Sequence, residues 1–139
     1  MTDLKKRLDV EFENIEGSLA ELPASRSCAN LSRIELAGVA ALLHTFYNGI
    51  EKILMNILKA NNIPLPEGPA WHQNLVTLAV TQNVITLNTA QKLTPYLAFR
   101  HFFIHAYVVH IEAERLEPLL MEIDDVFEKV KKDTAEFYS

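Results

Sequence analysis

A short segment in the last third of the chain places basic and aromatic polar side chains within an apolar run. The polar members of residues 99–111 are Arg100, His101, His105, Tyr107 and His110. Burying a guanidinium group without a partner is costly, so Arg100 should reach solvent, an acidic side chain or the phosphate of a ligand. Arginine supplies a fixed positive charge and histidine moves a proton near neutral pH. The segment is therefore a candidate site for chemistry on an anion.

The spacing of these residues says which of them can meet. At about 100° per residue, Arg100 and Tyr107 would lie on nearly the same side of a helix, and His101 and His105 would share a side one turn apart. Arg100 and His105 would be about 140° apart around an ideal helix. They can converge through the long arginine side chain, a local break, or a second copy of the helix in a dimer.

Two other interpretations of the histidines compete with anion chemistry. Two histidines at i and i+4 have the spacing of a zinc pair, but HFFIH has Phe102 where a metalloprotease-type HExxH motif needs Glu. No third ligand stands at a suitable spacing nearby, so we predict neither a metal nor another cofactor. A lone histidine on an apolar helix is usually a core residue, which we predict for His44, His72 and His110. Composition alone does not choose between a structural and an anion-handling role for the rest.

The remainder of the chain must position this segment, and its apolar spacing predicts helices. Glycine is rare, with 4 residues in 139, and 49% of the residues are hydrophobic. The first helix carries one apolar stripe and is ended by Pro23; the stripe is Leu4, Leu8, Phe12, Ile15, Leu19 and Leu22. Further helices are predicted over about 31–61, 70–85, 88–110 and 111–137, with Asn88 as the cap of the fourth. We expect one all-α domain over 1–139, an antiparallel bundle of four to five helices.

Composition limits the setting in which the protein works. The 13 basic and 18 acidic residues give a net charge of −5, and Cys28 is the single cysteine. Neither a membrane-spanning segment nor a signal peptide is evident, so we predict a cytoplasmic protein with no membrane partner. Net charge alone argues against a general nucleic-acid coat. However, residues 1–110 hold nine basic and nine acidic side chains, so the excess of acidic residues lies wholly in the last helix. That helix presents either a solvated acidic face or a surface for a partner.

The Arg-x4-His-x-Tyr pattern from Arg100 through His105 to Tyr107 resembles the signature of the HEPN superfamily. The Tyr two residues after the His is similar to that of HepT-like ribonuclease toxins, whose genes pair with a minimal nucleotidyltransferase (MntA-like) antitoxin. The resemblance extends to the segment AALLHTFYNGIEKILMNILK, which fits the second helix of that family, and to LTPYLAF, which leads into Arg100. We expect the resemblance to cover the whole chain.

The resemblance implies a function. Arg100 and His105 would be the catalytic pair of a metal-independent endoribonuclease, in which the 2′-hydroxyl of the RNA attacks the adjacent phosphate and leaves a 2′,3′-cyclic phosphate. A homodimer would place two motifs across one cleft, and the antitoxin would attach AMP to Tyr107, as in a type VII-like toxin–antitoxin system. His101 departs from the family pattern, where a polar residue such as Asn follows the Arg, and is an auxiliary candidate.

Two questions stay open at this point. Glu51, on the helix that matches the second helix of the family, is predicted either to orient Arg100 as a buried counter-charge or to be a solvated surface residue. The alternative to an enzyme is a non-catalytic HEPN module that binds a nucleotide or a nucleotidyltransferase partner. The sequence does not indicate whether the RNA substrate would be a transfer or a messenger RNA.

Overall fold

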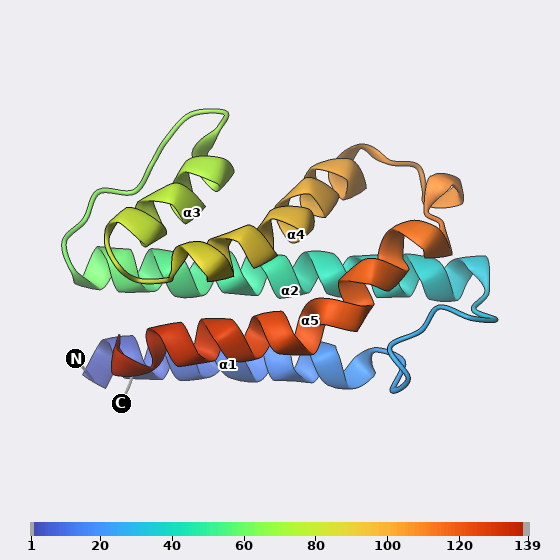
Figure 1. The fold of residues 1–139 in the computed structure, drawn as a ribbon, viewed down its shortest axis with the longest axis horizontal. Helices are drawn as coiled ribbons and strands as arrows, with labels where there is room; N and C mark the ends of the chain where they lie inside the picture. Colours follow the sequence, from blue (N-terminus) through green and yellow to red (C-terminus); the bar gives the residue numbers. More distant parts are fainter. Residues whose placement is uncertain (1, 138–139) are drawn as a thin grey trace.

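The computed structural model describes residues 2–137, which form five α-helices and two short 3-10 helices without any strand in that range. The elements are α1 (Thr2–Glu21), α2 (Arg33–Ala60), α3 (Trp71–Thr81), α4 (Leu87–His105), η1 (Val108–His110), α5 (Ala113–Thr134) and η2 (Ala135–Phe137). Figure 1 shows α1 and α4 running in one direction and α2 and α5 in the other. The predicted all-α helical bundle is confirmed.

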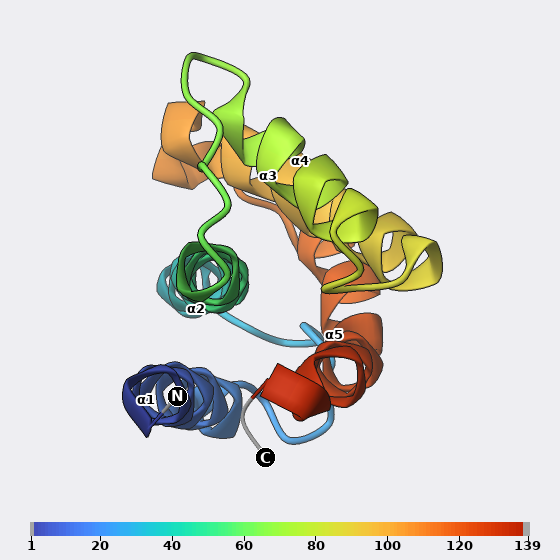
Figure 2. The ribbon, with the colours of Figure 1, turned by 90° about the vertical axis from the view of Figure 1, so that its left-hand side faces the viewer.

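The long helix α2 is the centre of the bundle, because it contacts each of the other four α-helices. The view along the long axis shows α1 and α5 on one side of α2, and α3 with α4 on the other (Figure 2). A capping box begins α2: the Ser32 hydroxyl accepts from the Glu35 amide at 3.1 Å, and the Glu35 carboxylate accepts from the Ser32 amide at 2.8 Å. Central position and long apolar faces make α2 the platform on which the other helices pack.

The predicted apolar stripe of α1 packs against this platform. All six of its members are at most 8% exposed, so the prediction from their spacing is confirmed. The two helices approach closely at Gly49, where a Cβ atom would lie 2.6 Å from Cγ1 of Ile15. Glycine at this position therefore sets how near α1 lies to α2.

Helix α4 differs from the prediction at both ends. Its N-cap is Thr86, whose hydroxyl accepts from the Thr89 amide at 3.1 Å, rather than Asn88. It ends at His105 rather than His110, because Ala106 is extended and Arg33 donates to the Val109 carbonyl at 2.6 Å, which ties the following segment to the start of α2.

A proline lies inside α4. Pro95 has no amide to donate to the carbonyl four residues before it, and Figure 1 shows α4 changing direction partway along its length. A proline inside a helix is tolerated only near the helix start or at such a kink. The second half of α4, which carries Arg100 and His105, thereby follows its own direction over α2. No helix of the described residues is long and apolar enough to cross a membrane.

Candidate functional site

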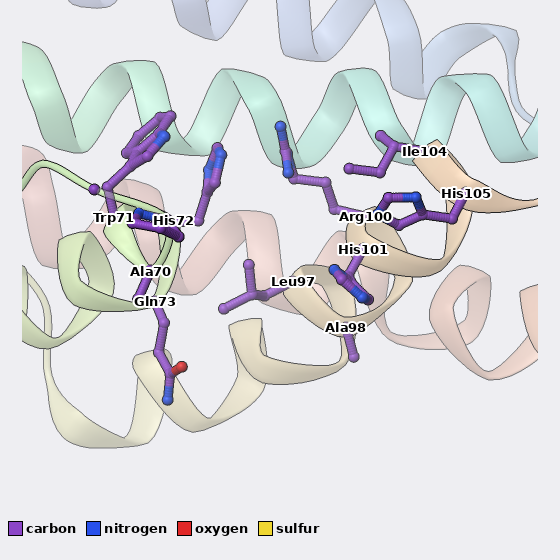
Figure 3. A pocket seen from close by; sticks show the side chains of 12 residues that line it. Ala70, Trp71, His72, Gln73, Leu97, Ala98, Arg100, His101, Ile104 and His105 are labelled. Carbon is purple, nitrogen blue, oxygen red and sulfur yellow. The ribbon is translucent and has the colours of Figure 1, made fainter.

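A pocket of about 770 Å³ lies between the start of α3 and the second half of α4. Residues 68–73 line one side of it, and the other side is lined by α4 residues, namely Leu97, Ala98, Arg100, His101, Ile104 and His105 (Figure 3). Both predicted catalytic residues, and the auxiliary candidate His101, are thus brought to one pocket within a single chain.

Arg100 lines this pocket without a bonded counter-charge. The side chain is half-buried and extends toward α2 (Figure 3), and its buried Nε atom has no hydrogen-bond partner. Among residues 2–137 no carboxylate forms an ion pair with it. The sequence allowed solvent, an acidic side chain or a ligand phosphate as the partner of Arg100, and the acidic side chain is therefore not used. An unpaired guanidinium group on a pocket wall is suited to bind an anion.

The two α4 histidines lie as their spacing predicts. The ring centroids of His101 and His105 are 4.9 Å apart in an edge-on arrangement, and both side chains are exposed. Figure 3 shows the His105 ring directed toward Arg100. The helix is unbroken between Arg100 and His105, so the reach of the side chains, and not a local break, brings both to the pocket.

Glu51 has a partner that the sequence did not reveal. Its side chain is buried, and both carboxylate oxygens lie within hydrogen-bond distance of Nδ1 of His72, at 2.9 Å and 2.8 Å. His72 lies in the first turn of α3 and lines the pocket beside Trp71, whose ring centroid is 3.6 Å from its own. Glu51 is therefore not the solvated surface residue of one alternative, and its bonds go to His72 rather than to Arg100.

The electrostatics around Glu51 reflect its burial. Burial raises the pKa of the carboxyl above its usual value, and this effect outweighs the opposite pull of His72 and Arg100. One turn earlier on α2, burial and the nearby Glu51 raise the pKa of Tyr47. Arg100 thus acts through space on the carboxylate beneath the pocket without bonding it.

The structure corrects the assignment of three histidines to the core. His110 is exposed in η1, and His72 lines the pocket. His44 is half-buried with its ring 5.0 Å from that of Phe103, but its Nδ1 atom is buried without a partner. Burial, followed by the positive charge of Arg100, lowers the pKa of His44. Sequence reasoning therefore missed His72 as a pocket residue.

Tyr107 lies beyond the end of α4, so the prediction that it shares a helix side with Arg100 is wrong. Its side chain is 75% exposed, with its ring 5.8 Å from that of His110. Ile104 and Val109 are exposed apolar neighbours in the chain, at 50% and 58%. In the described part of the chain, no three His, Cys, Asp or Glu side chains are grouped closely enough to hold a metal ion.

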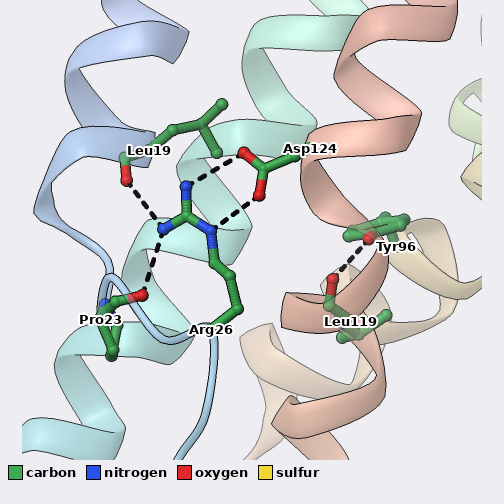
Figure 4. Close-up of polar contacts among 6 residues, drawn as sticks. All are labelled: Leu19, Pro23, Arg26, Tyr96, Leu119 and Asp124. Atoms are coloured by element: carbon green, nitrogen blue, oxygen red, sulfur yellow. Dashed lines mark hydrogen bonds and ion pairs between the residues drawn. The ribbon is translucent and has the colours of Figure 1, made fainter.

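The acidic residues of α5 fasten the loops of the bundle. Arg26 donates to both carboxylate oxygens of Asp124, at 2.8 Å and 3.0 Å, and to the carbonyls of Leu19 and Pro23 (Figure 4). Glu117 accepts from the Ser27 hydroxyl and the Cys28 amide, and Asp133 accepts from the Thr86 amide. Part of the acidic excess therefore holds α5 to the loops before α2 and α4.

Arg26→Ala is expected to lower the free energy of unfolding by about 1–2 kcal/mol at neutral pH, because a two-pronged charged contact is lost at a partly exposed site. The bonds from Arg26 lower the pKa of Asp124. This contribution is therefore present above the unfolded-state value of about 3.9 and is lost as pH falls through the lower folded-state pKa. Thermal unfolding from pH 7 down to pH 2 should show the difference between the two proteins shrinking. A difference that stays constant with pH would contradict the role of Asp124.

The all-helical arrangement of residues 2–137 is that of a HEPN-like helical bundle. The model of the family described as HepT-like protein matches residues 38–139, and the chain belongs to this family. The matched range includes α3, α4, α5 and most of α2, and therefore every residue of the pocket. No curated protein and no solved structure gives a significant match.

Proposed function

We propose that the chain is a metal-independent endoribonuclease toxin of a type VII-like toxin–antitoxin system, acting on RNA in the cytoplasm. The observation that carries this proposal is the pairing of Arg100 and His105 on one pocket wall, where no carboxylate of the described residues forms an ion pair or hydrogen bond with the guanidinium group of Arg100. A structural arginine would be expected to bond a carboxylate or carbonyl, as Arg26 does. A cation held without a partner is suited to an incoming phosphate.

The chemistry follows from these groups. The 2′-hydroxyl of the RNA attacks the adjacent phosphorus, its proton passes to a base, and Arg100 neutralises charge that develops on the phosphoryl oxygens. The bond from phosphorus to the 5′-oxygen breaks as that oxygen takes a proton, which leaves a 2′,3′-cyclic phosphate. A homodimer would bring a second copy of the motif to the cleft, and the exposed Ile104, Tyr107 and Val109 provide apolar surface for such a contact.

The same surface suits control by a minimal nucleotidyltransferase antitoxin. Tyr107 is accessible and lies two residues after His105, so a partner can reach its hydroxyl without opening the bundle. Attachment of AMP would add negative charge and bulk near the motif, where the phosphate would compete with RNA for Arg100.

His105→Ala tests the proposal, because it removes one of the two groups that define it. The purified chain, with a chelator present, should produce new 2′,3′-cyclic phosphate ends on total RNA. The variant should cleave about 10²–10⁴-fold more slowly, as expected for loss of a proton-transfer group. His110→Ala, an exposed histidine outside the pocket, is the matched control. Binding of RNA without any new cyclic ends would instead support a non-catalytic module.

A further inference from the structure

Cleavage by 2′-hydroxyl attack moves two protons, one from the nucleophile and one to the leaving group. A second imidazole already stands in the pocket of a single chain. His105 lies on the α4 side and His72 on the α3 side, and Arg100 lines the same pocket. A base and an acid are thus available around one guanidinium group without a second subunit.

His72 is held as a proton-transferring imidazole would be. The buried Glu51 fixes Nδ1, and the Trp71 ring packs against the imidazole at 3.6 Å between centroids. Within residues 2–137 the remaining ring nitrogen, Nε2, forms no hydrogen bond, and the side chain keeps 18% of its surface exposed. The carboxylate therefore selects the tautomer with the proton on Nδ1 and leaves Nε2 as the acceptor.

We propose that His72 is a second catalytic histidine of this pocket, acting as the base, and that Glu51 is its positioning residue. The proposal rests on the ribonuclease function proposed above. Nε2 of His72 takes the proton of the 2′-hydroxyl while the 2′-oxygen forms its bond to phosphorus. The bond from phosphorus to the 5′-oxygen breaks, and protonated His105 gives its proton to that oxygen. Glu51 stabilises the imidazolium that forms on His72.

A purely structural ion pair between α2 and α3 is the competing explanation. The groups around Glu51 argue for function: burial disfavours its charge, and the Arg100 cation acts on it from the pocket side. An apolar contact would join the helices without desolvating a carboxylate. Keeping a carboxylate there is expected where the imidazole above it must gain and lose a proton.

The test separates base from acid with two substrates. One is an RNA dinucleotide; the other has sulfur in place of the bridging 5′-oxygen, a leaving group that needs no proton. His72→Gln should lower kcat about 10²-fold or more on both substrates. His105→Ala should be similarly slow on the normal RNA but recover most of its rate on the sulfur substrate. His110→Gln, the matched control, should behave as the unaltered chain.

The pH profile of kcat in Glu51→Gln distinguishes a positioning role of Glu51 from a purely structural one. The amide can still bond His72 but stabilises an imidazolium less, so the acid limb of the kcat profile should move to lower pH while kcat falls. If the pair were purely structural, Glu51→Gln would instead lower thermal stability and leave the pH profile and the kcat per folded molecule unchanged.

Full kcat in His72→Gln, with His105→Ala inactive, would overturn the role of His72 and leave the proposed ribonuclease intact. Unchanged cleavage in both Arg100→Ala and His105→Ala would instead overturn the ribonuclease itself.

Discussion

Arg100→Ala is expected to lower kcat/KM for RNA cleavage by about 10²–10³-fold, the range for removing one preorganised donor from a developing anion. The same variant is expected to fold about as stably as the unaltered chain. Its guanidinium group makes no hydrogen bond or ion pair that the variant would lose, and its Nε atom is buried without a partner. Loss of activity without loss of stability distinguishes a functional arginine from a structural one.

The kcat/KM of Arg100→Lys should lie between that of Arg100→Ala and that of the unaltered chain. It keeps the positive charge but loses the planar fork that contacts two phosphoryl oxygens at once. Arg115→Ala is the matched control, because the Arg115 guanidinium group lies 3.9 Å from the Phe102 ring centroid and outside the pocket. Rates on a defined RNA oligonucleotide and thermal unfolding of each variant check this prediction. It would be wrong if Arg100→Ala lost stability and activity in parallel, or cleaved as fast as the control.

The helices and the shared side of His101 and His105 could be predicted because both depend on short-range spacing, whereas the pairing of Arg100 with His105, about 140° apart on an ideal helix, was implied only by the family resemblance. The apolar stripe of α1 and the one-turn separation of His101 and His105 follow from helical periodicity. The end of α4 could not be predicted this way. It depends on the bond from Arg33 to the Val109 carbonyl, which joins residues 76 positions apart in the chain. The prediction that Tyr107 shares a helix side with Arg100 is wrong for the same reason.

The Glu51 and His72 pair shows what kind of signal was missing. Glu51 lies four residues after Tyr47 on the buried face of α2, a position from which a carboxylate needs a partner. That signal was present in the sequence. The partner was not, because His72 follows a loop with three prolines and its approach depends on how α3 packs on α2. A buried charge can therefore be suspected from periodicity, but its counterpart has to come from tertiary structure.

Tyr107→Phe is expected to abolish neutralisation by a minimal nucleotidyltransferase while leaving cleavage nearly unchanged. The phenol oxygen is the atom that would accept AMP, and the ring without it keeps its place at the exposed end of the motif. Growth arrest should then persist when the antitoxin is co-expressed. Mass spectrometry of the unaltered chain, incubated with the antitoxin and ATP, should place AMP on Tyr107.

The other described tyrosines serve as internal controls for this experiment. Tyr47 is 0% exposed, and Tyr96 is 2% exposed with its hydroxyl donating to the Leu119 carbonyl at 2.6 Å (Figure 4), so neither can be modified in the folded protein. Neutralisation of Tyr107→Phe by the antitoxin would contradict AMP transfer to this residue. Loss of cleavage in Tyr107→Phe would place the phenol in the reaction itself. Persistence of both cleavage and growth arrest would make Tyr107 a control point that is separate from the chemistry of Arg100 and His105.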